Sequence, residues 1–261
     1  MQSQPKLSLS NNWHVSPLVI ADQQQLINQS ESLLAKGVQG GPAATATLCW
    51  SQAEGEGLVL GFSQKLYVVN ERELERKPLP IYHRRAGGTA VLVGPHLLGL
   101  DVFLPAGHPL ILADVVESYR WLGETWVDAL RLLGVETRVV SSAEANAQRD
   151  LLKQAATQER EAILRRACYG ALSPYEVAVG QRKVVGLDMI RRKTGSLLQA
   201  GLLLSWETER LAMLLGHSPE EQAMLRVGLR ERAIGLDELA GRIIPAEEAI
   251  WAFEQALAMR Q

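Results

Sequence analysis

Two residues that could do covalent chemistry together, Cys168 and Lys183, stand fifteen positions apart. A thiol reacts as its thiolate, so a nucleophilic cysteine needs a base or a positive charge nearby. No histidine lies between His108 and His217, so a local helper for Cys168 would be a lysine or an arginine. A lysine in a partly buried site loses its proton more readily and can act as a base. The pair indicates either a nucleophile with its activating partner, or a small core residue beside a solvated lysine.

The segment between these two residues predicts a way to bring them together. YEVAV (175–179) and RKVVGL (182–187) are typical of strands, and Gly180-Gln181 between them suits a type II′ turn. A hairpin of this kind folds the fifteen residues back into a short distance. The stretch 182–193 also holds five basic side chains and one acidic one. It is either a solvated strand and loop or a docking surface for an acidic or phosphate-bearing partner.

A double glycine marks a third candidate, the segment HRRAGGTAV (83–91). Two strands around Gly87-Gly88 are consistent with an ordinary hairpin turn. They are also consistent with a binding loop, because glycines let backbone N–H groups approach a ligand closely. Arginines beside such a loop favour an anionic ligand group.

The elements that must position these residues alternate between strand-like and helix-like patterns. Strands are expected at 44–50, 58–62, 79–85, 89–93, 97–104, 135–140 and 195–206. Helices are expected at 22–36, from about 114 to 133, from 142 toward 166, from 219, and at 245–259. Ser141 with Glu144, and Ser218-Pro219 with Glu221, are typical of helix starts. Together these expected strands and helices indicate one α+β domain with a sizeable sheet and a small helical C-terminal extension.

Composition narrows the class of protein. The net charge of −2 and the absence of an apolar run of roughly 20 residues argue against nucleic-acid and membrane partners. Residues 218–242 contain four arginines and five acids, which argues against a DNA-binding helix pair. The two cysteines and five histidines show no metal-site spacing, and GEGLVLG (55–61) does not fit a dinucleotide loop. Two cysteines and a start without a secretory signal predict a cytoplasmic protein.

Three blocks, in order, resemble the biotin/lipoate protein ligase superfamily, specifically the branch of lipoate–protein ligase A and the cysteine-dependent octanoyltransferases. WSQAEGEGLVLGFSQ (50–64) is similar to the family's first strand pair, which ends in Leu-Gly-x-x-Gln. HRRAGGTAV is similar to its double-glycine loop, with Ala86 in place of Ser or Thr. CYGALSPYEVAVGQRKVVG (168–186, with Ala167 before it) and TGSLLQAGLLL are similar to its lysine loop and following strand. Asp188 and Ala200 fall where the family more often has other residues.

The resemblance implies a mixed, largely antiparallel sheet packed by helices, with a catalytic domain at 12–215 and a helical extension at 216–261. It implies that Cys168 takes an octanoyl group from acyl carrier protein as a thioester. A lysine of a lipoyl domain, in the glycine cleavage H protein or a 2-oxoacid dehydrogenase E2, would then attack that thioester. Lys183 would help to deprotonate the thiol and the amine, while the substrate-binding residues Arg84, Gly87, Gly88 and Gly186 would shape the acyl site.

Two other functions stay open beside this one. An ATP-dependent lipoate–protein ligase would need ATP and magnesium, whereas the transferase needs no cofactor. A non-catalytic lipoyl- or acyl-carrier-binding protein would bind its carrier protein without transferring an acyl group.

Overall fold

The structure is a computed structural model that describes residues 13–39 and 45–260. The polar start of the chain, residues 1–12, lies outside the described residues. The strands are β1 (Trp13–Ala21), β2 (Ala46–Ala53), β3 (Gly57–Leu60), β4 (Ile81–His83), β5 (Val91–Val93), β6 (Leu97–Pro105), β7 (Arg138–Val139), β8 (Val177–Val179), β9 (Arg182–Arg192) and β10 (Gly195–Leu203).

Helices of very different length connect these strands. The α-helices are α1 (Gln23–Gln39), α2 (Glu71–Arg76), α3 (Arg120–Leu132), α4 (Ser142–Asp150), α5 (Gln158–Leu164), α6 (Thr208–Leu215), α7 (Pro219–Arg232), α8 (Leu236–Ala240) and α9 (Ala246–Met259). Short 3-10 turns are η1 (Leu66–Val68), η2 (Glu117–Tyr119), η3 (Leu151–Lys153) and η4 (Cys168–Gly170).

The strands form two sheets. The larger has the order β1-β2-β6-β10-β9-β8-β7, and the smaller has the order β4-β3-β5. The pairs β1–β2 and β3–β4 are parallel, and the other ladders are antiparallel. The predicted α+β class with a mixed, largely antiparallel sheet is confirmed, although the ten strands of the described residues divide between two sheets.

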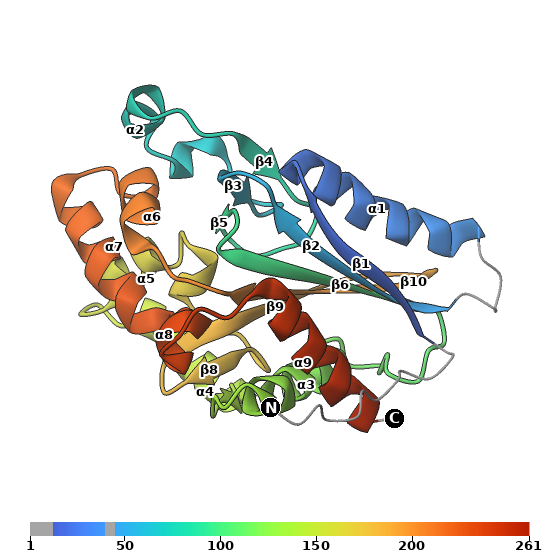
Figure 1. Cartoon of the computed structure of the whole chain (residues 1–261). Coiled ribbons are helices and arrows are strands. Elements are labelled where there is room, and N and C mark those ends of the chain that lie inside the picture. Colours follow the sequence, from blue (N-terminus) through green and yellow to red (C-terminus); the bar gives the residue numbers. More distant parts are fainter. Residues whose placement is uncertain (1–12, 40–44, 261) are drawn as a thin grey trace.

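The two faces of the large sheet are covered differently. Helices α3 and α9 lie together on one face, and α1 lies on the other (Figure 1). Trp50 of β2 and Trp126 of α3 meet Phe253 of α9, with ring centroids 5.4 Å and 4.6 Å from the phenyl ring. These aromatic side chains stand at the centre of the main core. Because each aromatic ring buries a large apolar area, this face contributes much of the stability of the fold.

A second core lies under the small sheet. Leucines of α6 and α7 pack there with residues of β3, β5 and α5. The last helices thus join both cores, α7 the second and α9 the main one. The division of the chain near residue 215 into a catalytic domain and a helical extension stays a prediction.

Most predicted elements are present, with two differences at helices. The helix expected from 142 toward 166 is interrupted: α4 ends at Asp150, and α5 begins at Gln158. Between them the Thr157 hydroxyl donates to the Leu151 carbonyl at 2.6 Å, which closes a turn in place of a helical hydrogen bond. The helix expected from about 114 begins as the turn η2 and becomes α-helical at Arg120. Both predicted serine caps are confirmed: Ser141 and Ser218 each accept the backbone N–H three residues on.

Candidate functional site

Cys168 lies at the start of a one-turn 3-10 helix that is tied to the end of the double-glycine loop. Ala167 and Ala90 form an isolated parallel β-bridge, and Cys168 N donates to Ala90 O at 2.7 Å. The cysteine is half-buried, whereas Cys49 is buried within β2. The backbone around Cys168 is therefore fixed while its side chain reaches a cavity.

Lys183 is almost completely buried, with a side chain 1% exposed. Its Nζ donates to Cys168 O at 2.8 Å and to Ala171 O at 2.6 Å, and it contacts both carboxylate oxygens of Glu176 at 2.9 Å. An ammonium group has three N–H donors, so this set uses all of them. Cys168 and Lys183 are brought together as predicted, but through the cysteine's backbone carbonyl.

The residue before Glu176 has an unusual backbone conformation. Tyr175 has φ = 65°, the one non-glycine in the left-handed region among the described residues. A non-glycine residue there is uncommon and marks a sharp local change of direction. Burial raises the pKa of the Glu176 carboxyl, and the Lys183 ammonium opposes that shift. The Tyr-Glu pair in the quoted motif was the sequence signal for this partner, which was not predicted as a site residue.

The double-glycine loop is held by Arg84. Its Nε donates to Gly87 O at 3.1 Å and one terminal nitrogen donates to Thr89 O at 3.2 Å. Gly88 has φ = 84°, and its carbonyl passes so close to Gly61 that a Cβ at Gly61 would lie 2.0 Å from it. Glycine is needed at Gly88 for the backbone angle and at Gly61 for this approach.

The first of the three motif blocks, residues 50–64, also contacts the Cys168 segment. Gln64 follows the Leu60-Gly61 turn, where its Oε1 accepts from Gly61 N at 3.3 Å. Its Nε2 donates to Arg166 O at 3.1 Å, two residues before Cys168. The three blocks singled out in the sequence therefore meet around one segment, residues 166–168.

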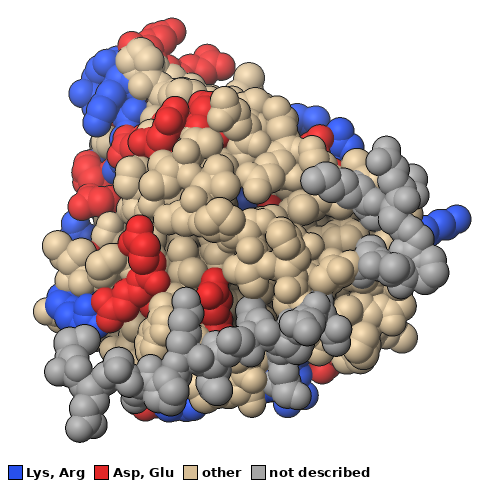
Figure 2. Space-filling model, turned by 45° about the vertical axis from the view of Figure 1, so that its right-hand side comes forward, with Lys and Arg blue, Asp and Glu red and all other residues tan. Residues whose placement is uncertain are grey.

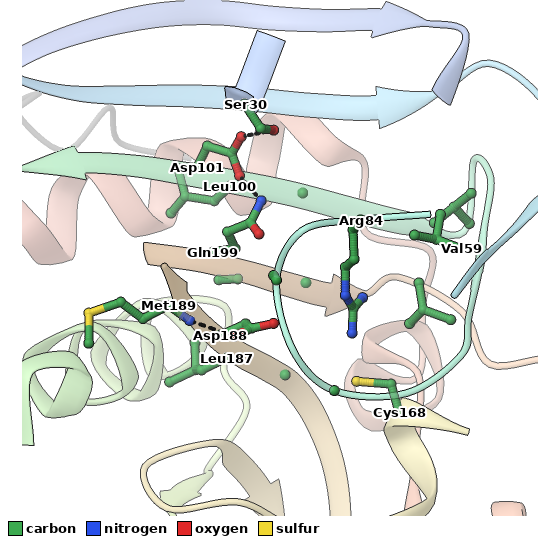
Figure 3. A pocket seen from close by; sticks show the side chains of 18 of the residues that line it. Ser30, Val59, Arg84, Leu100, Asp101, Cys168, Leu187, Asp188, Met189 and Gln199 are labelled. Carbon is green, nitrogen blue, oxygen red and sulfur yellow. Dashed lines mark hydrogen bonds between the residues drawn. The ribbon is translucent and has the colours of Figure 1, made fainter. Parts of the chain in front are cut away.

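A cavity of about 600 Å³ opens beside this segment. Such a volume falls in the ~300–1,000 Å³ range of small-molecule sites. Cys168, Lys183, Arg84, Gly88 and Gly186 all line it, and α1 lies over the opposite side. In Figure 3 the Arg84 guanidinium and the Cys168 thiol point toward the same part of this cavity. Gly87 lies outside the lining and contributes its carbonyl to Arg84.

Gly186 belongs to a row of three glycines across the sheet. It pairs with Gly201 of β10, which pairs with Gly99 of β6. The hydroxyl of Tyr169, the neighbour of Cys168, donates to Gly201 O at 2.6 Å. A Cβ at Gly201 would lie 2.8 Å from that hydroxyl. Burial raises the pKa of Tyr169 well above its ordinary value, so the phenol stays a neutral donor.

The cavity floor also carries polar residues that were not predicted as a site. Asp101 of β6, Gln199 of β10 and Asp188 of β9 are directly paired across the sheet. Asp101 accepts from Gln199 Nε2 at 2.7 Å and from the Ser30 hydroxyl of α1. Burial raises the pKa of both aspartates, and the charge of Arg84 opposes the shift at Asp188. These three residues meet because of the register in which β6, β10 and β9 pair. Sequence patterns do not give that register.

The basic stretch 182–193 is largely engaged within the molecule. Lys183 is buried, Arg182 pairs with Glu238 at 2.9 Å, and Arg191 donates to backbone carbonyls at 112 and 113 and to Ser118. Arg192 and Lys193 are exposed. In Figure 2, Lys and Arg gather at the margins of a face whose described centre is mostly uncharged. Lys183 is therefore not available to an acidic partner, and a docking surface on this stretch would depend mainly on Arg192 and Lys193.

The described residues show neither a cluster suited to a metal ion nor a membrane-spanning helix. Within residues 13–39 and 45–260 there is no group of three or more His, Cys, Asp or Glu that could hold a metal ion. In the same part of the chain, no helix has the length and apolar character needed to cross a membrane.

Comparison with known proteins places these features in a family. The model of the lipoyl protein ligase A/B catalytic domain matches residues 29–258. Octanoyltransferase LipM of Exiguobacterium sibiricum is 30% identical over 220 residues, which are 83% of this chain and 76% of that protein. Octanoyltransferase LipM of Brevibacillus brevis is 29% identical over 205 residues, 77% of this chain and 70% of that one.

Solved structures share the fold at low sequence identity. A bipartite lipoate protein ligase from Thermoplasma acidophilum, from a study that included its E2 lipoyl domain, gives a TM-score of 0.69 at 16% identity. That match covers 94% of this chain and 82% of the other. A lipoate-protein ligase A bound with ATP gives 0.63 at 15% identity, covering 92% and 81%.

Proposed function

The chain belongs to the lipoyl protein ligase A/B catalytic-domain family, as its motifs predicted, and on that premise we propose that it is an acyltransferase of protein lipoylation that carries an octanoyl group on Cys168. The observation that carries the proposal is the position of this cysteine. Its segment is joined to the double-glycine loop and to Lys183, and its side chain lines the cavity that the family's motifs surround. The relatives named octanoyltransferase LipM support the choice of acyl group.

The proposed reaction has two transfers. The Cys168 thiolate attacks the thioester carbonyl of octanoyl-acyl carrier protein, and the carrier thiol leaves with a proton. The neutral ε-amine of a lipoyl-domain lysine then attacks the Cys168 thioester, so that an amide forms and the cysteine thiol is regenerated. The donor and the acyl-enzyme product of the first step are both thioesters and have similar energy. The transfer therefore needs neither ATP nor a metal, and the partners are an acyl carrier protein and a lipoyl domain.

Lys183 and Arg84 have different places in this proposal. Lys183 holds the carbonyl of Cys168 and of Ala171, and so positions the turn that carries the thiol. In the proposal Lys183 also accepts a proton from the Cys168 thiol and from the incoming amine. To do so, its Nζ must first release one of these two carbonyl groups. Arg84, with Gly88 and Gly186, lines the acyl site. Its guanidinium is placed to stabilise negative charge on the acyl oxygen during attack.

The first test is the mass of the intact protein after mixing with octanoyl-acyl carrier protein without ATP. We expect one octanoyl adduct, removed by hydroxylamine, that Cys168→Ser abolishes. Cys49→Ser is the matched control, because Cys49 is buried in β2 with its thiol 3.7 Å from the Ser16 hydroxyl. This variant should load as the unchanged protein does.

Two other results would replace the proposal. Octanoylation or lipoylation of a lipoyl domain only with ATP and magnesium, unaffected by Cys168→Ser, would identify a ligase. Binding of the carrier proteins without any transfer would identify the non-catalytic alternative. A cytoplasmic location is part of the proposal, since acyl carrier protein is the donor.

A further inference from the structure

The floor of the cavity is not uniformly apolar along the path from Cys168. The glycine row Gly186–Gly201–Gly99 comes first, under Tyr169. Two residues further along each strand comes the row Asp188–Gln199–Asp101, which we call the polar row. Residues i and i+2 of a strand share a face, and their spacing is roughly 7 Å. An acyl chain that starts at Cys168 and crosses the glycines therefore reaches the polar row in its middle part.

Apolar residues continue beyond the polar row. Ile190 pairs with Leu197 in the next row on the same face, and both line the cavity. On the α1 side Leu26, Ile27 and Leu34 line it as well. The path is thus open past the polar row, so the row interrupts an apolar site and does not end it.

The polar row offers hydrogen-bond acceptors to a ligand. The Asp101 carboxylate already accepts hydrogen bonds from Ser30 and Gln199. Gln199 uses its amide nitrogen in that bond, which leaves its carbonyl oxygen toward the cavity. Asp188 accepts from Met189 N at 2.7 Å, its only hydrogen bond within the described chain. Figure 3 shows its carboxyl group directed into the space between Gln199 and Cys168.

A plain alkyl chain over these groups removes their water and returns no hydrogen bond. Each buried polar group left in that state lowers the affinity for such a ligand. Sites built to bind a hydroxyl reject the analogue that lacks it much more strongly than apolar pockets reject an extra methylene. An ammonium group is a poorer fit, because the Arg84 guanidinium lies in the same cavity and acts electrostatically on Asp188.

We infer that the acyl chain accepted by this protein carries a hydroxyl group in its middle part, bound by Asp188 and Gln199 of the polar row. The inference rests on the proposed acyl-transfer function for its biological meaning and specifies the substrate class of that site. The same row makes unsubstituted octanoyl the poorer of the two substrates.

The experiment is calorimetric binding of three free acids to the intact protein: octanoic acid, and octanoic acid hydroxylated on its second or its fifth carbon. We expect the last to bind about tenfold more tightly than octanoic acid, the equivalent of one net hydrogen bond. The hydroxyl near the carboxyl should give no such gain, since it lies over the glycine row. In Asp188→Ala the tenfold preference should disappear. Glu31→Ala, which removes another carboxylate from the lining, should keep it.

Equal or tighter binding of octanoic acid, with a ratio that Asp188→Ala does not change, would overturn the inference. Asp188→Leu, which has the same side-chain branching and number of heavy atoms, serves if the alanine variant fails to fold. Binding of free acids does not depend on transfer. A retained preference without a Cys168 adduct would therefore contradict the proposed function alone, and loading of octanoyl without the preference would contradict the polar-row inference alone.

Discussion

The two faces of the seven-stranded sheet are built from alternate residues of the same strands, yet one is packed with apolar side chains and the other borders an open, partly polar cavity. One row, whose side chains belong to the main core or pack against it, runs Trp50–Leu100–Ala200–Leu187 across β2, β6, β10 and β9. Its last three residues also border the cavity. The adjacent row on the cavity face runs Cys49–Asp101–Gln199–Asp188. A shift of one residue in register would exchange the two rows.

The difference shows how the fold separates stability from chemistry. On the packed face apolar side chains of α3 and α9 fill the space above the strands. On the cavity face the three glycines of the glycine row have no side chains to fill the space, so a cavity remains under α1. The polar row lies beside these glycines. Buried carboxylates and open volume both reduce stability, and the packed face offsets that reduction.

The largest effect should come from removing an aromatic ring of the packed face. Phe253 is fully buried against Trp50 and Trp126, so Phe253→Ala leaves a cavity that its neighbours cannot fill. We expect a loss of about 4 kcal/mol in the free energy of unfolding, measured by urea denaturation. Ile190→Ala on the cavity face is the control. It should cost less than half as much, because its side chain borders open space. Equal losses would break the comparison between the faces.

The contrast between the faces also separates what the sequence predicted from what it did not. Glycine and proline punctuation, serine caps and apolar periodicity located most elements. The hairpin across Gly180 brought Cys168 and Lys183 together as expected, since turn chemistry is local. The polar row is a product of register between β6, β9 and β10, whose residues are far apart in the chain. Likewise, Lys183 was expected at the thiol, but the buried Glu176 and two carbonyls use its donors.

A smaller but still large effect is expected at the pair under the Cys168 turn. Glu176→Gln keeps the shape and removes the countercharge of the buried Lys183. Breaking a buried ion pair from one side costs about 3 kcal/mol. We also expect slower formation of the Cys168 thioester, since Lys183 holds that segment. Urea denaturation and the rate of adduct formation measure the two effects.

The neighbouring residue of β9 supplies the matched control. Arg182 pairs with Glu238 in an exposed bridge, with side chains 39% and 63% accessible. Glu238→Gln should change stability by less than about 1 kcal/mol and leave thioester formation unchanged. Comparable losses in both variants would mean that burial of Lys183 is unimportant.

The smallest effect should be a gain in stability when a carboxylate is removed from the polar row. Burial raises the pKa of Asp188 in the folded state above its unfolded value. Well below the usual aspartate pKa of about 4, both states are protonated and the group has no effect on stability. As the pH rises past that value, the unfolded chain ionises first and binds fewer protons than the folded one. Stability therefore falls with rising pH until the folded pKa is passed.

Asp188→Asn removes this titration and should stabilise the protein at neutral pH by about 1 kcal/mol, roughly 2–4 °C in Tm for a chain of this size. The gain should shrink in acid below the aspartate range, and thermal unfolding at the two pH values measures it. Asp150→Asn, at a side chain 55% exposed and paired with Lys153, should show no such gain. A loss of stability at neutral pH would mean that ionised Asp188 stabilises the fold. The carboxylate on the cavity face would then not lower the free energy of unfolding, and the packed face would have nothing to offset there.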